Sequence, residues 1–142
     1  MTFNVAIGMY LSDKYLFRTV GCHGPSMMPT FDTRNNLLLV DVFTTQFVRI
    51  PRKGEIIITE NPFKPGTTLV KRVINTEGEM AEFYCSRTKM NQKVEIPQGH
   101  IWIEGDNKKA SRDSRDFGPL SLCLVDGIVR ARIWPFDKIM RC

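Results

Sequence analysis

Short apolar runs separated by turn-forming residues recur along the chain after residue 14. The runs are rich in β-branched and aromatic residues, which favour β-strands. Strands are therefore predicted at 15–22, 35–43, 55–60, 67–76, 79–85, 93–97, 100–105 and 127–134. Turn sequences such as TRNN, PRKG, NPFKPG and TEGE lie between them. We expect a mainly β fold, a single domain of coiled antiparallel sheets.

The N-terminus follows a different pattern. Its first 12 residues carry no charge, and an Asp-Lys pair then interrupts the apolar stretch. Four of its residues share one helical face: Phe3, Ile7, Tyr10 and Leu11. The stretch is shorter than the roughly 20 apolar residues that span a bilayer, and it fits an interfacial helix, a weak anchor or a core helix. We expect residues 1–20 to form a short N-terminal helix or anchor able to associate with a membrane, and residues 21–142 to form the main domain.

Composition narrows the class of protein. Of the 142 residues, 42% are hydrophobic and 25% charged, close to globular averages. The net charge of +5 comes from scattered basic residues, which favours a solvated surface over a nucleic-acid-binding patch. The four cysteines lack CxxC spacing and the two histidines do not form a pair, so no metal site and no cofactor are expected. The sequence leaves open whether the cysteines are free or form disulfides.

The stretch HGPSMMPTF, residues 23–31, holds one serine in a stiff setting. Gly24, Pro25 and Pro29 restrict the backbone around Ser26. Serine with glycine and proline is ordinary turn composition, so a plain turn is the first interpretation. The hydroxyl becomes a candidate nucleophile only where a neighbouring base removes its proton.

A candidate base lies in the apolar run TTLVKRVINT. Lys71 and Arg72 interrupt this strand, and alternation sends their side chains to opposite faces. One of the two charges therefore points towards the core. A buried lysine responds with a lowered pKa and then serves as a general base. The simpler alternative is a lysine on an edge strand whose ammonium reaches solvent.

The longest interruption between strands is GDNKKASRDSRDFGPLS, residues 105–121. A loop of this length in a small domain is either functional or disordered. Its acidic, basic and hydroxyl side chains are able to bond to one another and to the backbone, which favours an ordered loop.

With a serine in a stiff turn, a lysine in an apolar strand and a long polar loop, the sequence resembles the signal peptidase I family, which uses a Ser-Lys dyad. The closest resemblance is to the catalytic subunits of the mitochondrial inner membrane peptidase, of the first-subunit type. The matching motifs, in family order, are PSMMPT (25–30), LVKRV (69–73) and GDNKKASRDSRDFGP (105–119), with a weaker match at RKGEIIITENP (52–62).

The resemblance implies a role for each matching residue. Ser26 is the expected nucleophile and its backbone N–H an oxyanion donor, while Lys71 is the expected general base. In some relatives a second hydroxyl donor lies two residues before the nucleophile, where this chain has Gly24. Ser111 matches the hydroxyl that orients the lysine amine. The residues expected to support the catalytic loop are Asp106, Asp113 and Arg115, and those expected to contact substrate are Met27 and Pro29.

The same resemblance implies a function. We expect a membrane-associated serine endopeptidase that removes targeting sequences from proteins sorted to the mitochondrial inner membrane or intermembrane space. Its active site would face the intermembrane space, its substrates would be precursor proteins, and a second peptidase subunit would be its partner. The alternative is a small basic β-barrel that binds nucleic acid, although basic and aromatic residues rarely interleave here. A repressor-type protease would need a DNA-binding domain, and only 25 residues precede Ser26.

Overall fold

One curled antiparallel sheet organises the computed structural model, which describes residues 7–8, 11–12 and 15–142. Its strand order is β1-β2-β9-β3-β4-β7-β8, with β10 paired to β9. The strands are β1 Phe17–Cys22, β2 Asn36–Asp41, β3 Ile56–Glu60, β4 Thr68–Asn75, β7 His100–Glu104, β8 Leu120–Ser121, β9 Val125–Trp134 and β10 Met140–Arg141. The predicted mainly β fold is confirmed.

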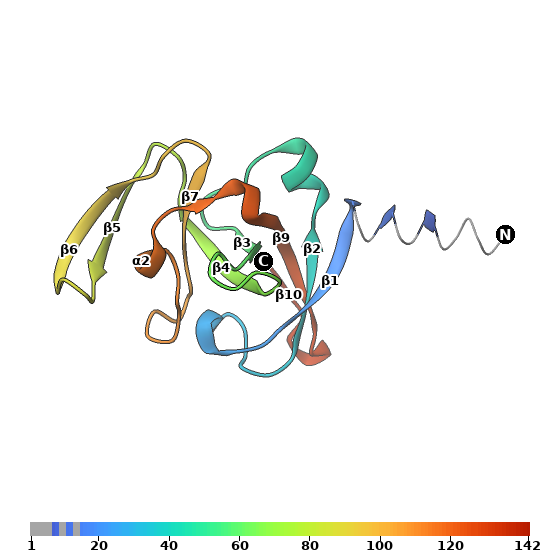
Figure 1. Ribbon diagram of the computed structural model, residues 1–142. Helices are drawn as coiled ribbons and strands as arrows, with labels where there is room; N and C mark the ends of the chain where they lie inside the picture. The colour runs from blue at the N-terminus through green and yellow to red at the C-terminus, as the bar shows by residue number, and fades with distance from the viewer. Residues whose placement is uncertain (1–6, 9–10, 13–14) are drawn as a thin grey trace.

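A separate hairpin, β5 Met80–Cys85 with β6 Met90–Glu95, projects from the end of the molecule near β7, opposite β1 (Figure 1). Short helical turns lie between the strands: η1 Pro25–Met27, η2 Thr44–Val48, α2 Ser114–Phe117, η3 Leu122–Leu124 and η4 Phe136–Lys138. Helix α2 lies between the hairpin and the curled sheet (Figure 1).

The core explains why β3 is a continuous apolar run. Ile56 and Ile58 pack into one cluster with residues of β1, β2 and η1, whereas Ile57 packs into a second cluster with β4, β7 and β9. A strand buried on both faces loses the polar-apolar alternation of a half-exposed strand. A third, smaller cluster around Trp102 anchors the hairpin to β7.

Most strand predictions are confirmed, and the differences have local causes. Strand β6 begins at Met90, three residues before the predicted start, because its first residues project into solvent and lack apolar alternation. The two-residue strands β8 and β10 and helix α2 were not predicted. Helix α2 begins after Asp113, whose side chain forms a capping box with Asp116.

At the N-terminus, β1 begins at Phe17, so the sheet extends across the boundary expected at residue 20. Within the segment where a helix was expected, residues 7–8, 11–12 and 15 are helical, and residues 1–6, 9–10 and 13–14 lie outside the described residues. Among the described residues, the helices are all too short or too polar to cross a bilayer.

Candidate active site

Ser26 lies in the 3-10 turn η1, between a glycine and a core anchor. Gly24 has φ +108°, a conformation that favours glycine, and Pro25 begins the turn. Met27 is 1% exposed and packs in the first core cluster, while the Phe31 N–H donates to the Met27 carbonyl at 2.9 Å. Because both sides of the turn are fixed, the half-buried Ser26 is presented on a rigid backbone.

Strand β4 places Lys71 opposite this turn. Lys71 is 3% exposed and pairs in register with Ile57, while η1 packs against β4. Burial lowers the pKa of Lys71, and the nearby Asp113 carboxylate offsets part of that effect. Of the adjacent Lys71 and Arg72, Lys71 is therefore the residue that faces the core. This agrees with the interpretation of Lys71 as a buried lysine and not with that of an edge-strand lysine that reaches solvent.

The second charge, Arg72, has a structural partner on the other face of β4. Its guanidinium donates to both carboxylate oxygens of Asp106, at 2.8 Å and 2.7 Å, and to the Gly54 carbonyl at 2.8 Å. The Thr30 hydroxyl also donates to Asp106. Burial opposes ionisation of Asp106, but the bonds from Arg72 and Thr30 hold its pKa below the usual range. Asp106 thus joins β4 to the segment that follows Ser26, a link that the sequence analysis did not find.

Asp113 is the fully buried centre of the loop 105–113. Its Oδ2 accepts hydrogen bonds from the Ser111 hydroxyl at 2.6 Å and the Gly105 N–H at 2.9 Å. Arg115 donates to both oxygens, from Nε at 2.8 Å and Nη2 at 2.9 Å. Burial alone would raise the pKa of Asp113, but these donors lower it. The loop is therefore ordered, and Asp113 and Arg115 form the pair that was expected to support it.

The loop is bonded directly to the serine turn. The Asn107 N–H donates to the Ser26 carbonyl at 2.9 Å. A methyl group added to Gly105 would lie 2.2 Å from Ser111 Oγ and 2.6 Å from the Ser26 carbonyl oxygen. Ser26, Ser111 and Gly105 therefore meet at one point, although up to 85 residues separate them in sequence.

The cysteines, which all lie among the described residues, form no disulfide near this site. All four cysteines are free, and Cys22 is a buried thiol near Lys71 whose pKa is raised by burial. His23, the neighbour of Cys22, is exposed. Within the described part of the chain, no group of histidine, cysteine and acidic residues is arranged to hold a metal ion.

The chain matches the family described as signal peptidase, peptidase S26, over residues 1–94 and 82–134. It is 35% identical over 131 residues to the mitochondrial ATP-independent inner membrane protease subunit 1b of Arabidopsis thaliana, covering 91% of this chain and 77% of that protein. The chain belongs to the signal peptidase family S26.

Other relatives within the S26 family carry two kinds of subunit name. The mitochondrial inner membrane protease subunit 1 of Xenopus tropicalis is 38% identical over 126 residues, which cover 88% of this chain and 74% of that protein. Subunit 2 of the same protease from Schizosaccharomyces pombe (strain 972 / ATCC 24843) is 34% identical over 119 residues, covering 83% of this chain and 65% of that protein. These relationships support a peptidase and not the nucleic-acid-binding alternative.

In this S26 peptidase, the two residues expected to contact substrate differ in exposure. The side chain of Met27 is buried in the core, so it is not available at the surface. Pro29 is exposed and lines a cavity beside Thr30, Gly105 and Asp106. At position 24, where some relatives were expected to have a hydroxyl donor, this chain has a glycine.

Proposed function

We propose that the protein is a serine endopeptidase that removes targeting sequences from precursor proteins sorted to the mitochondrial inner membrane or intermembrane space. The observation that carries this proposal is the burial of Lys71 on β4, the strand against which the rigid Ser26 turn packs. Membership of the S26 family supports the removal of targeting sequences, and the inner membrane protease names of its relatives support the membrane location.

In the proposed reaction, the neutral Lys71 amine takes the proton of the Ser26 hydroxyl as Ser26 Oγ attacks the scissile carbonyl carbon. The resulting oxyanion accepts a hydrogen bond from the Ser26 backbone N–H. The Lys71 ammonium then gives its proton to the leaving amine, and an acyl-enzyme ester forms. Water, deprotonated by the same amine, attacks this ester, and proton return to Ser26 releases the new carboxyl end.

Ser111 is placed to aim the lysine. Its hydroxyl hydrogen is already donated to Asp113, so its oxygen lone pairs are left to accept a bond from the Lys71 amine. A flexible four-carbon stem needs such a partner to direct its nitrogen at Ser26. Asp113 and Arg115 hold Ser111 in that orientation, and Asp106 fixes the start of the loop.

The substrate is proposed to bind as an added strand. Strand β7 pairs with β4 from Arg72 onwards, and within the described residues no strand pairs with the same edge of β4 over Thr68–Lys71. Strand β1 offers a second free edge, because it pairs with β2 alone among the described strands. An extended precursor would use these backbone groups, with Pro29 and the backbone of Met27 in contact with it.

The proposed location is the inner membrane, with the catalytic domain facing the intermembrane space. A second peptidase subunit is the proposed partner, because relatives carry both subunit 1 and subunit 2 names. Carbonate extraction of mitochondria and protease protection test this location. Recovery of the chain as a freely soluble matrix protein would contradict it.

The function is tested by comparing protein N-termini in mitochondria that contain the intact chain, Ser26→Ala or Lys71→Ala. Both variants should fold and both should leave a set of inner-membrane or intermembrane-space proteins unprocessed, because the two residues act as one unit. Ser121→Ala, on β8, and Lys89→Ala, in the exposed turn of the hairpin, serve as matched controls. Unchanged N-termini in the Ser26→Ala cells would refute the proposal.

A further inference from the structure

Glu104 is a buried carboxylate that the proposed chemistry does not use. It is the last residue of β7, and its side chain is 9% exposed. Its Oε1 accepts a hydrogen bond from the Trp102 indole N–H at 2.9 Å. Its Oε2 accepts no hydrogen bond from the described residues, and its ion-pair partner there is Lys108 Nζ at 3.8 Å.

The Glu104 side chain lines two adjoining cavities, of about 500 Å³ and about 240 Å³. Both cavities are also lined by Glu82 and Lys108, so together they form one groove, called here the Glu104 groove. One end of the groove reaches Pro29 and Thr30, beyond the Ser26 turn, and the other reaches the hairpin.

A carboxylate at this position needs an explanation. Residues 101–105 are all buried, and a charge held away from water costs free energy that an apolar side chain would avoid. Trp102, on the same face of β7, packs in the hairpin cluster and shows that the face tolerates apolar residues. The Glu104 carboxylate lines the wall of a cavity, one residue from the Gly105–Ser26 contact, and this position suits a polar group that binds a ligand.

The position also suits an extended substrate. In register, Glu104 lies opposite Arg72, where β7 stops and the free edge of β4 begins. A precursor strand on that edge would continue the line of β7 beyond Glu104. Its side chains would alternate between the Lys71 face and the Arg72 face of the sheet. Those on the Arg72 face would enter the Glu104 groove.

We propose that the Glu104 groove is a specificity subsite for a basic side chain, lysine or arginine, of the precursor, close to the scissile bond. This inference rests on the proposed peptidase function. Glu104 is its specificity-determining residue, and Lys108 fills the subsite in the free protein. The Lys108 side chain is 74% exposed, so an incoming cation displaces it without disturbing the core.

The charges around the groove favour a cation over an anion. The positive charges of Arg72 and Arg115 are each matched by a bidentate carboxylate, Asp106 and Asp113 respectively. With Lys108 displaced, the remaining groups are the Glu104 carboxylate and, at the rim, Glu82, which pairs with Lys93 at 2.6 Å. Arg115 also lines the groove and interacts electrostatically with Glu104, but its guanidinium is bound to Asp113, so a basic side chain is attracted to Glu104 and an acidic one repelled.

The test uses internally quenched peptides. Their sequence is that of a cleavage site identified by comparing protein N-termini in mitochondria that contain the intact chain or Ser26→Ala. Each position within four residues of the scissile bond is changed in turn to lysine, to its apolar isostere norleucine, or to glutamate. At one position, the intact protein should prefer lysine to norleucine by about tenfold or more in kcat/KM. Glu104→Gln should abolish this preference, and Lys108→Ala should increase it, since the resident cation is removed.

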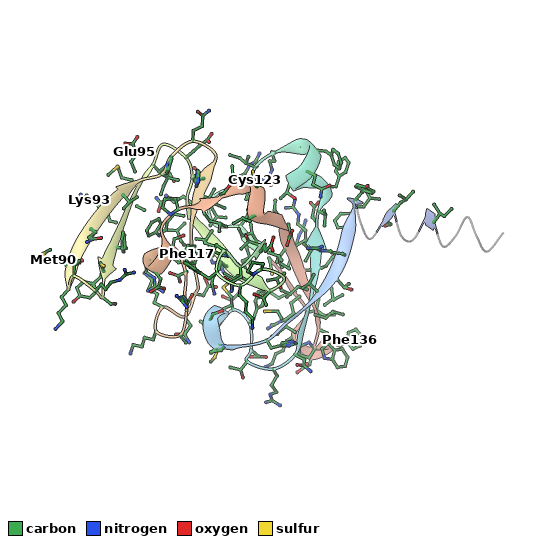
Figure 2. All side chains as sticks on the ribbon, viewed as in Figure 1. Met90, Lys93, Glu95, Phe117, Cys123 and Phe136 are labelled. Carbon is green, nitrogen blue, oxygen red and sulfur yellow. The ribbon has the colours of Figure 1, made fainter. Side chains whose placement is uncertain are left out.

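Glu95→Gln is the matched control, because Glu95 is an exposed glutamate on β6, at the outer face of the hairpin (Figure 2). It should leave the preference unchanged. Thermal unfolding of Glu104→Gln shows whether the variant folds, and if it does not, Lys108→Ala alone decides. Ser26-dependent cleavage with no preference for a basic residue, or with a preference that survives Glu104→Gln, would overturn this inference while the peptidase function stands. Absence of any Ser26-dependent cleavage would instead refute the peptidase function and this inference with it.

Discussion

At the scale of single residues, the Lys71 amine decides how the reaction depends on pH. Burial lowers the pKa of Lys71, and the base is active only when neutral. Activity should therefore rise with pH along a limb whose midpoint lies well below about 10.4, the value of a free lysine. The measurement is kcat/KM against pH with one peptide substrate.

The neighbouring carboxylate offers a check on that assignment. Asp113 raises the pKa of Lys71 by its charge, so Asp113→Asn should move the limb to lower pH in the activity that remains. A limb centred near the free-lysine value, or one that stays in place in Asp113→Asn, would show that Lys71 is not the titrating base.

Ser111 is expected to orient the Lys71 amine and to contribute little to the stability of the fold. Ser111→Ala should lower kcat by about 10- to 1000-fold, which corresponds to about 1.4–4 kcal/mol of transition-state stabilisation. The melting temperature should change little, because Asp113 keeps its bonds from Gly105 and Arg115. Single-turnover kinetics and thermal unfolding measure the two effects.

Asp113→Ala is the informative comparison for Ser111→Ala. It leaves Arg115 without its carboxylate and removes the centre of the loop, so it should lower both activity and stability, the latter by about 3–5 kcal/mol. If Ser111→Ala proved harmless to turnover but costly to folding, Ser111 would be a structural residue of the loop.

At the scale of elements, the end of β7 and the serine turn meet with no space between them. Gly105→Ala would place its methyl group 2.6 Å from the Ser26 carbonyl oxygen, which belongs to the backbone and cannot swing aside. The loop must then move away from η1, with a loss of stability of about 1–3 kcal/mol and most of the activity. Thermal unfolding and peptide cleavage are the measurements.

Gly21→Ala is the control for that substitution. An added methyl at Gly21, on β1, meets His23 at an ordinary contact distance of 3.7 Å. Its melting temperature should stay close to that of the intact protein. If Gly105→Ala behaved in the same way, the close contact between the loop and the serine turn would not matter.

At the scale of the whole molecule, three buried or half-buried aspartates form ion pairs with arginines, and two of these pairs join segments that are distant in sequence. Asp41 binds Arg130, Asp106 binds Arg72 and Asp113 binds Arg115. Burial opposes ionisation of each, but their hydrogen bonds lower the pKa of all three. Because their folded pKa values lie below the unfolded value of about 3.9, they stabilise the fold above that pH.

That stabilisation should be lost as the pH falls from about 4.5 through the folded pKa values. The melting temperature, measured from about pH 7 down to about pH 3, should drop steeply in this window. Asp41→Asn, which lies outside the active site, should flatten the drop as well as lower the melting temperature at neutral pH. A melting temperature that is independent of pH across this window would contradict the role of these pairs.

Much of the fold was predictable because a strand carries its own signal. The alternating or continuous apolar runs of β2, β3, β4 and β9 mark strands wherever they occur in the chain. Strands β8 and β10 escaped prediction because two residues are too few to show a period. Helix α2 was hidden in the polar loop, although the Asp113–Asp116 spacing is a capping signal that the sequence does contain.

The sequence by itself determined the strands, the stiff serine turn and the conflict between charge and burial at the Lys-Arg pair, since each depends on neighbours in the chain. Only the tertiary structure decided that Lys71 faces inward and that Arg72 binds Asp106. It alone brought Ser26, Gly105 and Ser111 to one point and placed Glu104 on the wall of a groove. The physical reason is that these contacts join residues far apart in sequence. Which face of a strand is buried, and which loop crosses its end, is set by packing against the whole sheet and not by the local pattern.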